Sequence, residues 1–269
     1  MRGVQADPGQ DGRFRAVSGV DGSSGGAPAG ASAPSGAAAP LGASAVSAPP
    51  GWGTAGQPTT TLLLRHGATE LSAERKFAGR GDAALTKDGR NQASLVAKRL
   101  ADGPGIDVIV TSPLQRARHT AEAVAESTGA PMIVDDALVE ADFGAWEGLS
   151  FAEAGERWPE QMAAWMASPD AAPPGGESFA TVALRVLAAL DRLIESHRHE
   201  RAVVVSHVTP IKTLVCRALL APPEAMFRMN LDVASLTRVD CFDNGSAMLR
   251  SLNDTAHLRP SRRRWLPNR

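Results

Sequence analysis

Two short apolar runs in this chain each end in a histidine. Residues 62–64 are three leucines followed by Arg65 and His66, and residues 202–205 lead into a serine and His207. Runs of this length and content are typical of parallel strands that are buried on both faces. Ligands of open α/β sheets bind beyond the carboxyl ends of such strands. We therefore expect Arg65 and both histidines to line one ligand crevice rather than to sit in the core.

Strand-like and helix-like patterns alternate along most of the chain. We expect helices beginning near Thr86, Ser112, Trp158, Phe179 and Pro210, and further strands at residues 106–110, 132–134, 138–139, 236–242 and 248–252. Ser112 as a cap with Pro113 at the first helical position is typical of a helix start, and Asn244-Gly245 is typical of a hairpin turn. The alternation predicts an α/β domain with a parallel sheet and right-handed crossovers.

Composition divides the chain into a tail and a domain. Residues 1–58 are dominated by Gly, Ala, Ser and Pro, so they bury too little apolar surface to offset the entropy of ordering them. We expect a disordered tail or linker there, one folded domain over residues 59–256 and a short basic tail over residues 257–269. We find neither a secretory signal nor a membrane-spanning apolar run, and we therefore expect a cytoplasmic protein with no membrane partner.

Charge and cysteine content narrow the functional classes. The net charge is −1 at pH 7, which gives no support for a nucleic-acid binder. Cys216 and Cys241 lie far apart without CxxC spacing, so we expect two buried reduced thiols rather than a disulfide or a zinc site. The oligomeric state stays open, with a homodimer as one option.

Several charged residues lie where an anion could bind. Arg116 falls in the first turn of a predicted helix, where a cation is unfavourable unless an anion binds nearby. The loop at residues 68–85 holds Arg75, Lys76 and Arg80, and it is either a flap over an anion or a solvated basic loop.

An acidic segment at residues 140–148 supplies candidate proton donors. It holds Glu140, Asp142 and Glu147, interleaved with two large aromatic side chains that can desolvate a carboxyl group and raise its pKa. Arginines offer permanent forked donors to phosphate oxygens, a neutral imidazole can attack phosphorus, and a carboxylic acid can protonate the leaving oxygen. The residue types therefore favour phosphoryl transfer.

The order of the motifs resembles that of the histidine phosphatase superfamily, the phosphoglycerate mutase-like fold. The matching stretches are RHGATE at residues 65–70, SPLQRA at 112–117, Glu140 with FG at 143–144 and WEG at 146–148, GES at 176–178, and VVSH at 204–207. The resemblance implies a three-layer αβα sandwich around a mostly parallel sheet with an antiparallel edge strand. It also implies that neither a metal nor another cofactor is needed.

The resemblance also implies residue roles. His66 would be the nucleophile, and Glu140 would donate a proton to the leaving group, with Asp142 and Glu147 as alternatives. Gly67 would let the backbone turn tightly and come close to the ligand. The residues expected at a small phosphorylated substrate are Arg65, Gly67, Ser72, Arg116, His207 and Val208.

Departures from the mutase pattern point to the phosphatase branch of the family. Ala68 and Ser72 replace an acid and an asparagine common in mutases, and Val208 replaces a common glycine. These traits are similar to those of acid phosphatases and α-ribazole-phosphate phosphatases. We therefore expect a metal-independent phosphomonoester hydrolase. The alternatives are a cofactor-dependent phosphoglycerate mutase and a non-catalytic phospholigand-binding protein.

Overall fold

The computed structural model describes residues 56–259, and these form an α/β sandwich around a six-stranded sheet in the order β3-β2-β4-β1-β5-β6. The strands are β1 (Thr59–Arg65), β2 (Val108–Thr111), β3 (Met132–Val134), β4 (Arg201–Ser206), β5 (Leu236–Cys241) and β6 (Ala247–Asp254). The first four are mutually parallel, whereas β5 and β6 run antiparallel at one edge. The predicted fold class is confirmed: β5 pairs antiparallel with both β1 and the edge strand β6, and the rest of the sheet is parallel.

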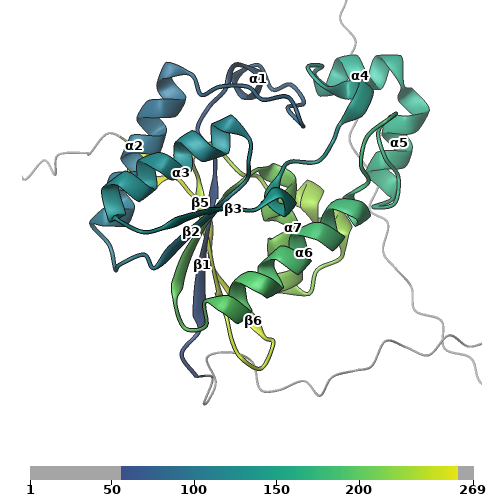
Figure 1. Cartoon of the computed structure of the whole chain (residues 1–269). Helices are drawn as coiled ribbons and strands as arrows, with labels where there is room; N and C mark the ends of the chain where they lie inside the picture. Colours follow the sequence, from purple (N-terminus) through teal and green to yellow (C-terminus); the bar gives the residue numbers. More distant parts are fainter. Residues whose placement is uncertain (1–55, 260–269) are drawn as a thin grey trace, which may run out of the picture. The chain divides into compact units, whose positions relative to one another are not determined.

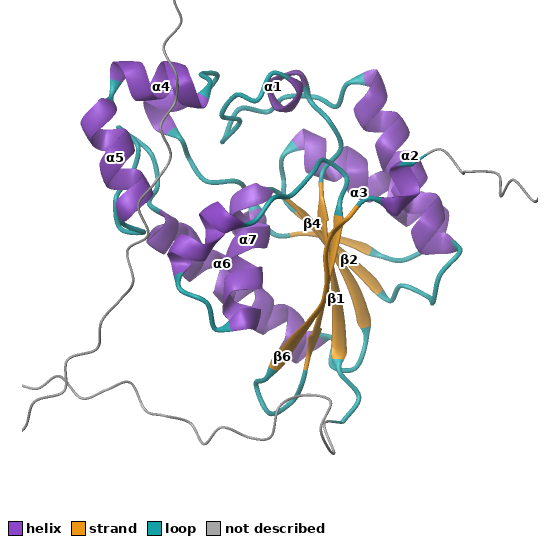
Figure 2. Ribbon diagram, turned by 180° about the vertical axis from the view of Figure 1, so that it is seen from behind, coloured by secondary structure: helices purple, strands orange, loops and turns teal. Residues whose placement is uncertain are grey.

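Helices cover both faces of this sheet (Figure 1). They are α1 (Glu70–Ala73), α2 (Lys87–Ala101), α3 (Gln115–Thr128), α4 (Phe151–Arg157), α5 (Pro159–Ala167), α6 (Phe179–Ser196) and α7 (Val208–Leu219). One layer contains α2 and α3, and the other contains α6 and α7, as the reverse view also shows (Figure 2). The short helices α1, α4 and α5 lie beyond the carboxyl ends of the parallel strands (Figure 1). Within residues 56–259, no helix is long and apolar enough to span a bilayer.

The core follows from the alternation of side chains along the buried strands. Leu62 and Leu64 of β1 pack with the apolar faces of α2 and α3. Leu63, which points the other way, packs with residues of α6 and α7. A strand that is apolar on consecutive positions is therefore filled on both sides, as the sequence predicts.

The pairing of β1 with β4 sets the position of the two histidines. In the parallel register, Arg65 lies opposite Ser206, and the backbone N–H of His66 donates to the carbonyl of Ser206 at 3.1 Å. His66 and His207 thus leave adjacent strands at the same level. Two apolar runs separated by well over a hundred residues meet here because parallel strands end at the same edge of the sheet.

Two local predictions are wrong. Residues 138–139 are not a strand, because residues Asp136–Leu138 form a 3₁₀ helix whose first turn is capped by the Asp135 carboxylate. Helix α3 does not begin with a Ser112 cap and Pro113. The Ser112 hydroxyl instead lies 2.8 Å from His207 Nε2, and α3 begins at Gln115, whose N–H donates to the Asp82 carboxylate at 2.6 Å.

The remaining expectations concern helix starts, the hairpin turn, the cysteines and the two tails. Helix α7 begins at Val208, two residues earlier than predicted, and α4 was not predicted at all. The hairpin turn is present, with Gly245 at a φ of 79°, and both cysteines are buried free thiols. The predicted disordered tail, apart from residues 56–58, and most of the predicted basic tail lie outside the described residues.

Candidate active site

His66 is held by its own backbone neighbour. Its Nδ1 lies 2.7 Å from the Gly67 carbonyl oxygen, so Nδ1 carries the proton and donates it to this bond. Within residues 56–259, no hydrogen bond uses Nε2. The side chain is 4% exposed, and burial together with the Arg116 and Arg65 guanidinium groups lowers the pKa of His66 well below 6.5. The imidazole is therefore neutral at pH 7, with a lone pair on Nε2.

His207 lies beside His66 but deeper in the protein. The two ring centroids are 5.1 Å apart, and His207 is completely buried, which contradicts the expectation of a crevice residue outside the core. Its Nε2 bonds to Ser112 Oγ, whereas its Nδ1 is buried without a partner among the described residues. Burial, Arg116 and the neighbouring His66 lower the pKa of His207 well below 6.5.

Two arginines bring positive charge to the same place. Arg116 is fully buried in the first turn of α3, and Arg65 is partly buried at the end of β1. The Nε atom of each is buried and has no partner within residues 56–259. An unpaired buried donor costs free energy that a bound anion would recover. The two guanidinium groups and the two imidazoles thus form a cluster that suits a tetrahedral oxyanion.

The other nitrogens of Arg116 hold the loop after α1. They donate to the carbonyl oxygens of Ala78, Gly79 and Gly81 at 2.7–3.2 Å. The Glu147 carboxylate accepts the N–H groups of this loop at residues 79–81, at 3.0–3.2 Å. The loop is therefore fastened through both its carbonyl and its amide groups.

Glu140 is the member of the acidic segment that lies at the cluster. It is 4% exposed, and its carboxylate accepts the N–H groups of Val208 and Thr209 in the first turn of α7 at 3.0–3.4 Å. The other two candidates are engaged elsewhere: Glu147 binds the loop at residues 79–81, and Asp142 accepts the Gly144 N–H at 2.8 Å.

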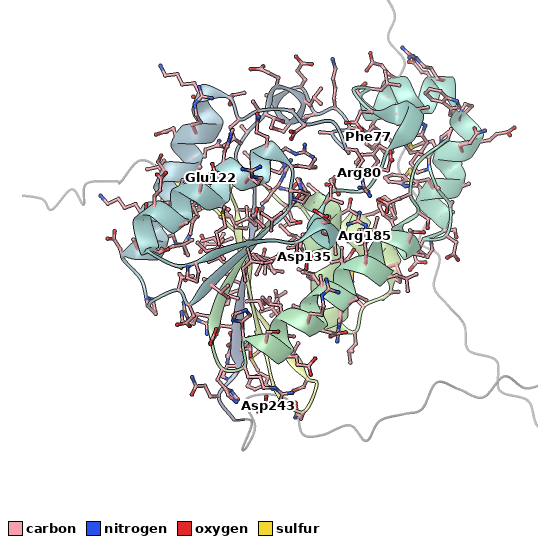
Figure 3. The ribbon with its side chains drawn as sticks, in the orientation of Figure 1. Phe77, Arg80, Glu122, Asp135, Arg185 and Asp243 are labelled. Atoms are coloured by element: carbon pink, nitrogen blue, oxygen red, sulfur yellow. The ribbon has the colours of Figure 1, made fainter. Side chains whose placement is uncertain are left out.

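Arg185 of α6 positions Glu140 from behind. It donates to the carbonyls of Ala137, Val139 and Glu140 at 2.6–3.1 Å and pairs with the Glu177 carboxylate. Glu177 also pairs with Arg80 at 2.9 Å, and hydrogen bonds from the two arginines hold the pKa of Glu177 down at about 2. Figure 3 shows Arg80 and Arg185 near each other, with Arg80 above Arg185 in this view. Arg80 thus pairs with an acid of the protein itself. It is not a free cation of a flap that waits for an anion.

A pocket of about 310 Å³ opens in front of His66. Arg65, His66 and Glu140 line one end of it, together with Ser72 and Val208. The remaining wall is largely apolar and consists mainly of Phe77, Phe143, Phe151, Trp165, Phe179, Met226 and Phe227. The arrangement places a neutral imidazole and a carboxyl group in the wall of a cavity that can hold a small organic group.

Comparison with known proteins agrees with this geometry. The sequence model of the histidine phosphatase superfamily (branch 1) matches residues 61–255. The chain belongs to this superfamily.

Three similar proteins illustrate the range of the family. This chain is 47% identical over 210 residues to the bifunctional protein Rv2228c of Mycobacterium tuberculosis, a match that covers 78% of this chain but only 58% of that protein. It is 32% identical to phosphoserine phosphatase 1 of Hydrogenobacter thermophilus, over 73% of this chain and 93% of the relative. The structure of mycobacterial glucosyl-3-phosphoglycerate phosphatase Rv2419c with VO3 matches with a TM-score of 0.67 and 30% identity, over 73% of this chain and 100% of that one.

Two predicted substrate contacts, Gly67 and Ser72, also have structural roles in this chain. A Cβ on Gly67 would clash with the Gly89 carbonyl of α2, and the Gly67 N–H donates to Thr120 Oγ1 at 3.1 Å. The glycine is thus needed for close packing against α2. Ser72 lines the pocket, but its hydroxyl donates to the Thr69 carbonyl in a capping box.

Arg185 and Lys212 are parts of this region that the sequence reasoning missed. Both interrupt predicted apolar helices: Arg185 lies next to Val186 of the buried stripe in α6, and Lys212 follows Ile211 in α7. A lone cation beside such a stripe is the signal that could have marked them. Within the described residues, no group of three or more His, Cys, Asp or Glu could hold a metal ion.

Proposed function

We propose that this protein is a metal-independent phosphomonoester hydrolase that forms a phosphohistidine intermediate on His66. The observation that carries the proposal is the state of His66, which is neutral, fixed through Nδ1 and free at Nε2 between two arginines. Covalent catalysis by such a nucleophile divides hydrolysis into two easier steps.

In the first step, Nε2 attacks phosphorus and the bond between phosphorus and the alcohol oxygen breaks. Arg65, Arg116 and His207 would stabilise the charge on the phosphoryl oxygens, through donors that are unpaired in the free protein. In the second step, water attacks phosphorus, the N–P bond breaks, and His66 and inorganic phosphate are released. The net reaction consumes one water molecule and yields the alcohol and phosphate.

Glu140 is the proposed proton donor to the leaving alcohol. It lines the same pocket as His66, whereas Asp142 and Glu147 are bonded to backbone N–H groups away from it. In the protonated state, Glu140 would pass its proton to the departing oxygen, and in the second step it would take a proton from the attacking water. The two steps thus restore the acid.

The proposed substrate is a small phosphorylated metabolite. The pocket volume of about 310 Å³ suits an alcohol of metabolite size. Two relatives carry names that refer to such substrates, phosphoserine and glucosyl-3-phosphoglycerate. The apolar wall also makes an aryl phosphate a suitable test substrate.

Hydrolysis of p-nitrophenyl phosphate tests the activity. We expect steady release of phosphate that EDTA does not reduce, and a loss of at least about a thousandfold in His66→Ala, since removing a covalent nucleophile removes the pathway. His119→Ala, on the exposed face of α3, serves as the matched control and should keep full activity. Isomerisation of 3-phosphoglycerate faster than its hydrolysis would contradict the proposal in favour of a mutase. Phosphate binding without turnover would identify a non-catalytic binding protein.

A further inference from the structure

The pocket contains a second positive charge at a distance from the phosphate cluster. Lys76 and Lys212 are the two lysines that line it. Lys76 pairs with Glu74 at 2.7 Å and lies at the surface. Lys212, on α7, is partly buried, and within residues 56–259 it makes no hydrogen bond or ion pair. Lys76 therefore has a charged partner within the protein, whereas Lys212 has none among the described residues.

No acid near Lys212 is available to neutralise it. Glu140 is the carboxylate that acts on Lys212 electrostatically, and both oxygens of Glu140 already accept backbone N–H groups. Arg65 adds a like charge nearby, and burial together with this arginine lowers the pKa of Lys212. A buried cation next to another cation is costly unless an anion binds to it.

The position of Lys212 on α7 relates it to the reacting end of the pocket. Val208 and Lys212 are four residues apart, so both lie on the same face of the helix, and both line the pocket. The rise of an α-helix separates their backbones by about 6 Å along its axis. Val208 directly follows His207, so Lys212 lies about one helical turn away from the phosphate cluster.

We propose that Lys212 determines specificity by binding an anionic group, such as a carboxylate, on the alcohol half of the substrate. This inference rests on the proposed phosphatase function. Apart from the residues of the phosphate cluster and the uncharged Thr209, the rest of the wall is apolar or already paired, so an acidic substituent on the alcohol would find its counter-charge at Lys212. The phosphoryl group would occupy the cluster around His66 at the same time.

Binding of two ligands that differ in one carboxylate tests this role. The ligands are 3-phosphoglycerate and glycerol 3-phosphate, measured by calorimetry on His66→Ala, so that nothing is turned over. Adding Lys212→Met keeps the length and apolar stem of the side chain. It should lower the affinity for 3-phosphoglycerate about tenfold or more, the usual effect of losing a hydrogen bond to a charged group. The affinity for glycerol 3-phosphate should change by less than about twofold. This ligand has no carboxylate, so the substitution alters only the packing around a side chain that the ligand does not bind.

Lys98→Met on the same background removes an exposed lysine of α2 that does not line the pocket, so it is the matched control and should leave both affinities unchanged. Equal weakening of the two ligands by Lys212→Met would assign Lys212 to the phosphoryl group and overturn the inference. No effect on either ligand, or no preference of the parent for 3-phosphoglycerate, would also overturn it. Circular dichroism and thermal unfolding confirm that each variant is folded. Failure of aryl phosphate hydrolysis in the unmodified protein would instead overturn the proposed function, and the binding comparison would still decide the role of Lys212.

Discussion

At the scale of single residues, His66 and His207 are neighbours with different tasks. His66 donates from Nδ1 to the Gly67 carbonyl and leaves Nε2 without a partner among the described residues, whereas His207 uses Nε2 to contact Ser112 and leaves Nδ1 without one. Burial and the nearby arginines lower the pKa of both. Holding two cations and two neutral rings together has an electrostatic cost in the free protein. Binding of a phosphate dianion would reduce this cost.

The lowered pKa of His66 predicts how phosphoenzyme formation depends on pH. In the proposed mechanism the neutral imidazole is the nucleophile, and a lowered pKa keeps it neutral as the pH falls through 6.5. We therefore expect the rate of phosphoryl transfer to His66, measured by rapid quench, to stay constant from pH 8 to pH 6 and to fall only at lower pH. A rate that declines with a midpoint near 6.5 would show that the surroundings do not shift the pKa.

Arg185 predicts a large effect on stability from a residue outside the reacting cluster. Arg185→Met leaves three carbonyl groups without their donor and Glu177 without its main partner. We expect a loss of roughly 2–4 kcal/mol in the free energy of unfolding, measured by urea denaturation. Arg192→Met, on the same helix as Arg185, removes an exposed ion pair with Asp135. It should lower the free energy of unfolding by less than about 1 kcal/mol. Equal effects would refute the structural role of Arg185.

Residue types alone identified the members of the reacting cluster but not their supports. Arg65, His66, Arg116 and His207 could be predicted because charged residues at strand ends and in a first helical turn are unusual. Glu140 could not be separated from Asp142 and Glu147 without knowing which backbone N–H groups each one binds. The supporting role of Arg185 depends on carbonyls that are distant in the sequence, and no local pattern encodes that contact.

At the scale of elements, the contact between α2 and the segment after β1 depends on two glycines. A Cβ on either Gly67 or Gly89 would clash with the backbone of the other segment. The segment after β1 therefore reaches α2 without side chains between them. This close approach lies one residue away from His66 and helps to fix where its ring lies.

Replacing one of these glycines should disturb both packing and catalysis. We expect Gly67→Ala to lower the free energy of unfolding by roughly 1–3 kcal/mol, as overpacking does, and to reduce phosphatase activity. Gly155→Ala in α4, where a Cβ has open space, should be neutral or stabilising by about 0.5–1 kcal/mol. Thermal unfolding of both variants is the measurement. An unchanged stability of Gly67→Ala would mean that the backbones separate at little cost.

Predictions of elements succeeded where periodicity was strong and failed where a side chain had a distant partner. The buried strands and the long helix α6 follow from their apolar patterns. Ser112 and Pro113 have the local signature of a helix start, but the Ser112 hydroxyl is bonded to His207 instead. The apolar pair at residues 138–139 was too short to separate a strand from the 3₁₀ helix that ends there.

At the scale of the whole domain, the parallel sheet gathers residues from distant parts of the chain at one edge. The carboxyl ends of β1 and β4 supply the two histidines, the start of α3 supplies Arg116, and the segment after β3 supplies Glu140. Helices cover the two faces of the sheet and leave these groups at the strand ends. The fold thus concentrates cations and buried titratable groups in one region.

This concentration predicts a stability that declines with acidity in two stages. The pKa values of His66 and His207 are lowered in the folded state, so the unfolded chain binds more protons and stability is lost as the pH falls below 6.5. The pKa values of Glu177 and Asp254 are lowered to about 2, so further stability is lost as the pH falls from about 4.5 toward 2. We expect urea midpoints to decrease from pH 7 to pH 5 and again below pH 4.5. His207→Gln should flatten the first decrease, and a midpoint that does not change between pH 7 and pH 5 would contradict the account.

The most direct test of the central claim is to trap the phosphoryl group on the protein. After brief mixing with a ³²P-labelled phosphomonoester and an alkaline quench, which preserves phosphohistidine, peptide mass spectrometry should locate one acid-labile phosphoryl group on His66. A His66→Ala variant should carry none. Phosphate on another residue, or turnover at full rate in the absence of any labelled protein, would contradict nucleophilic catalysis by His66.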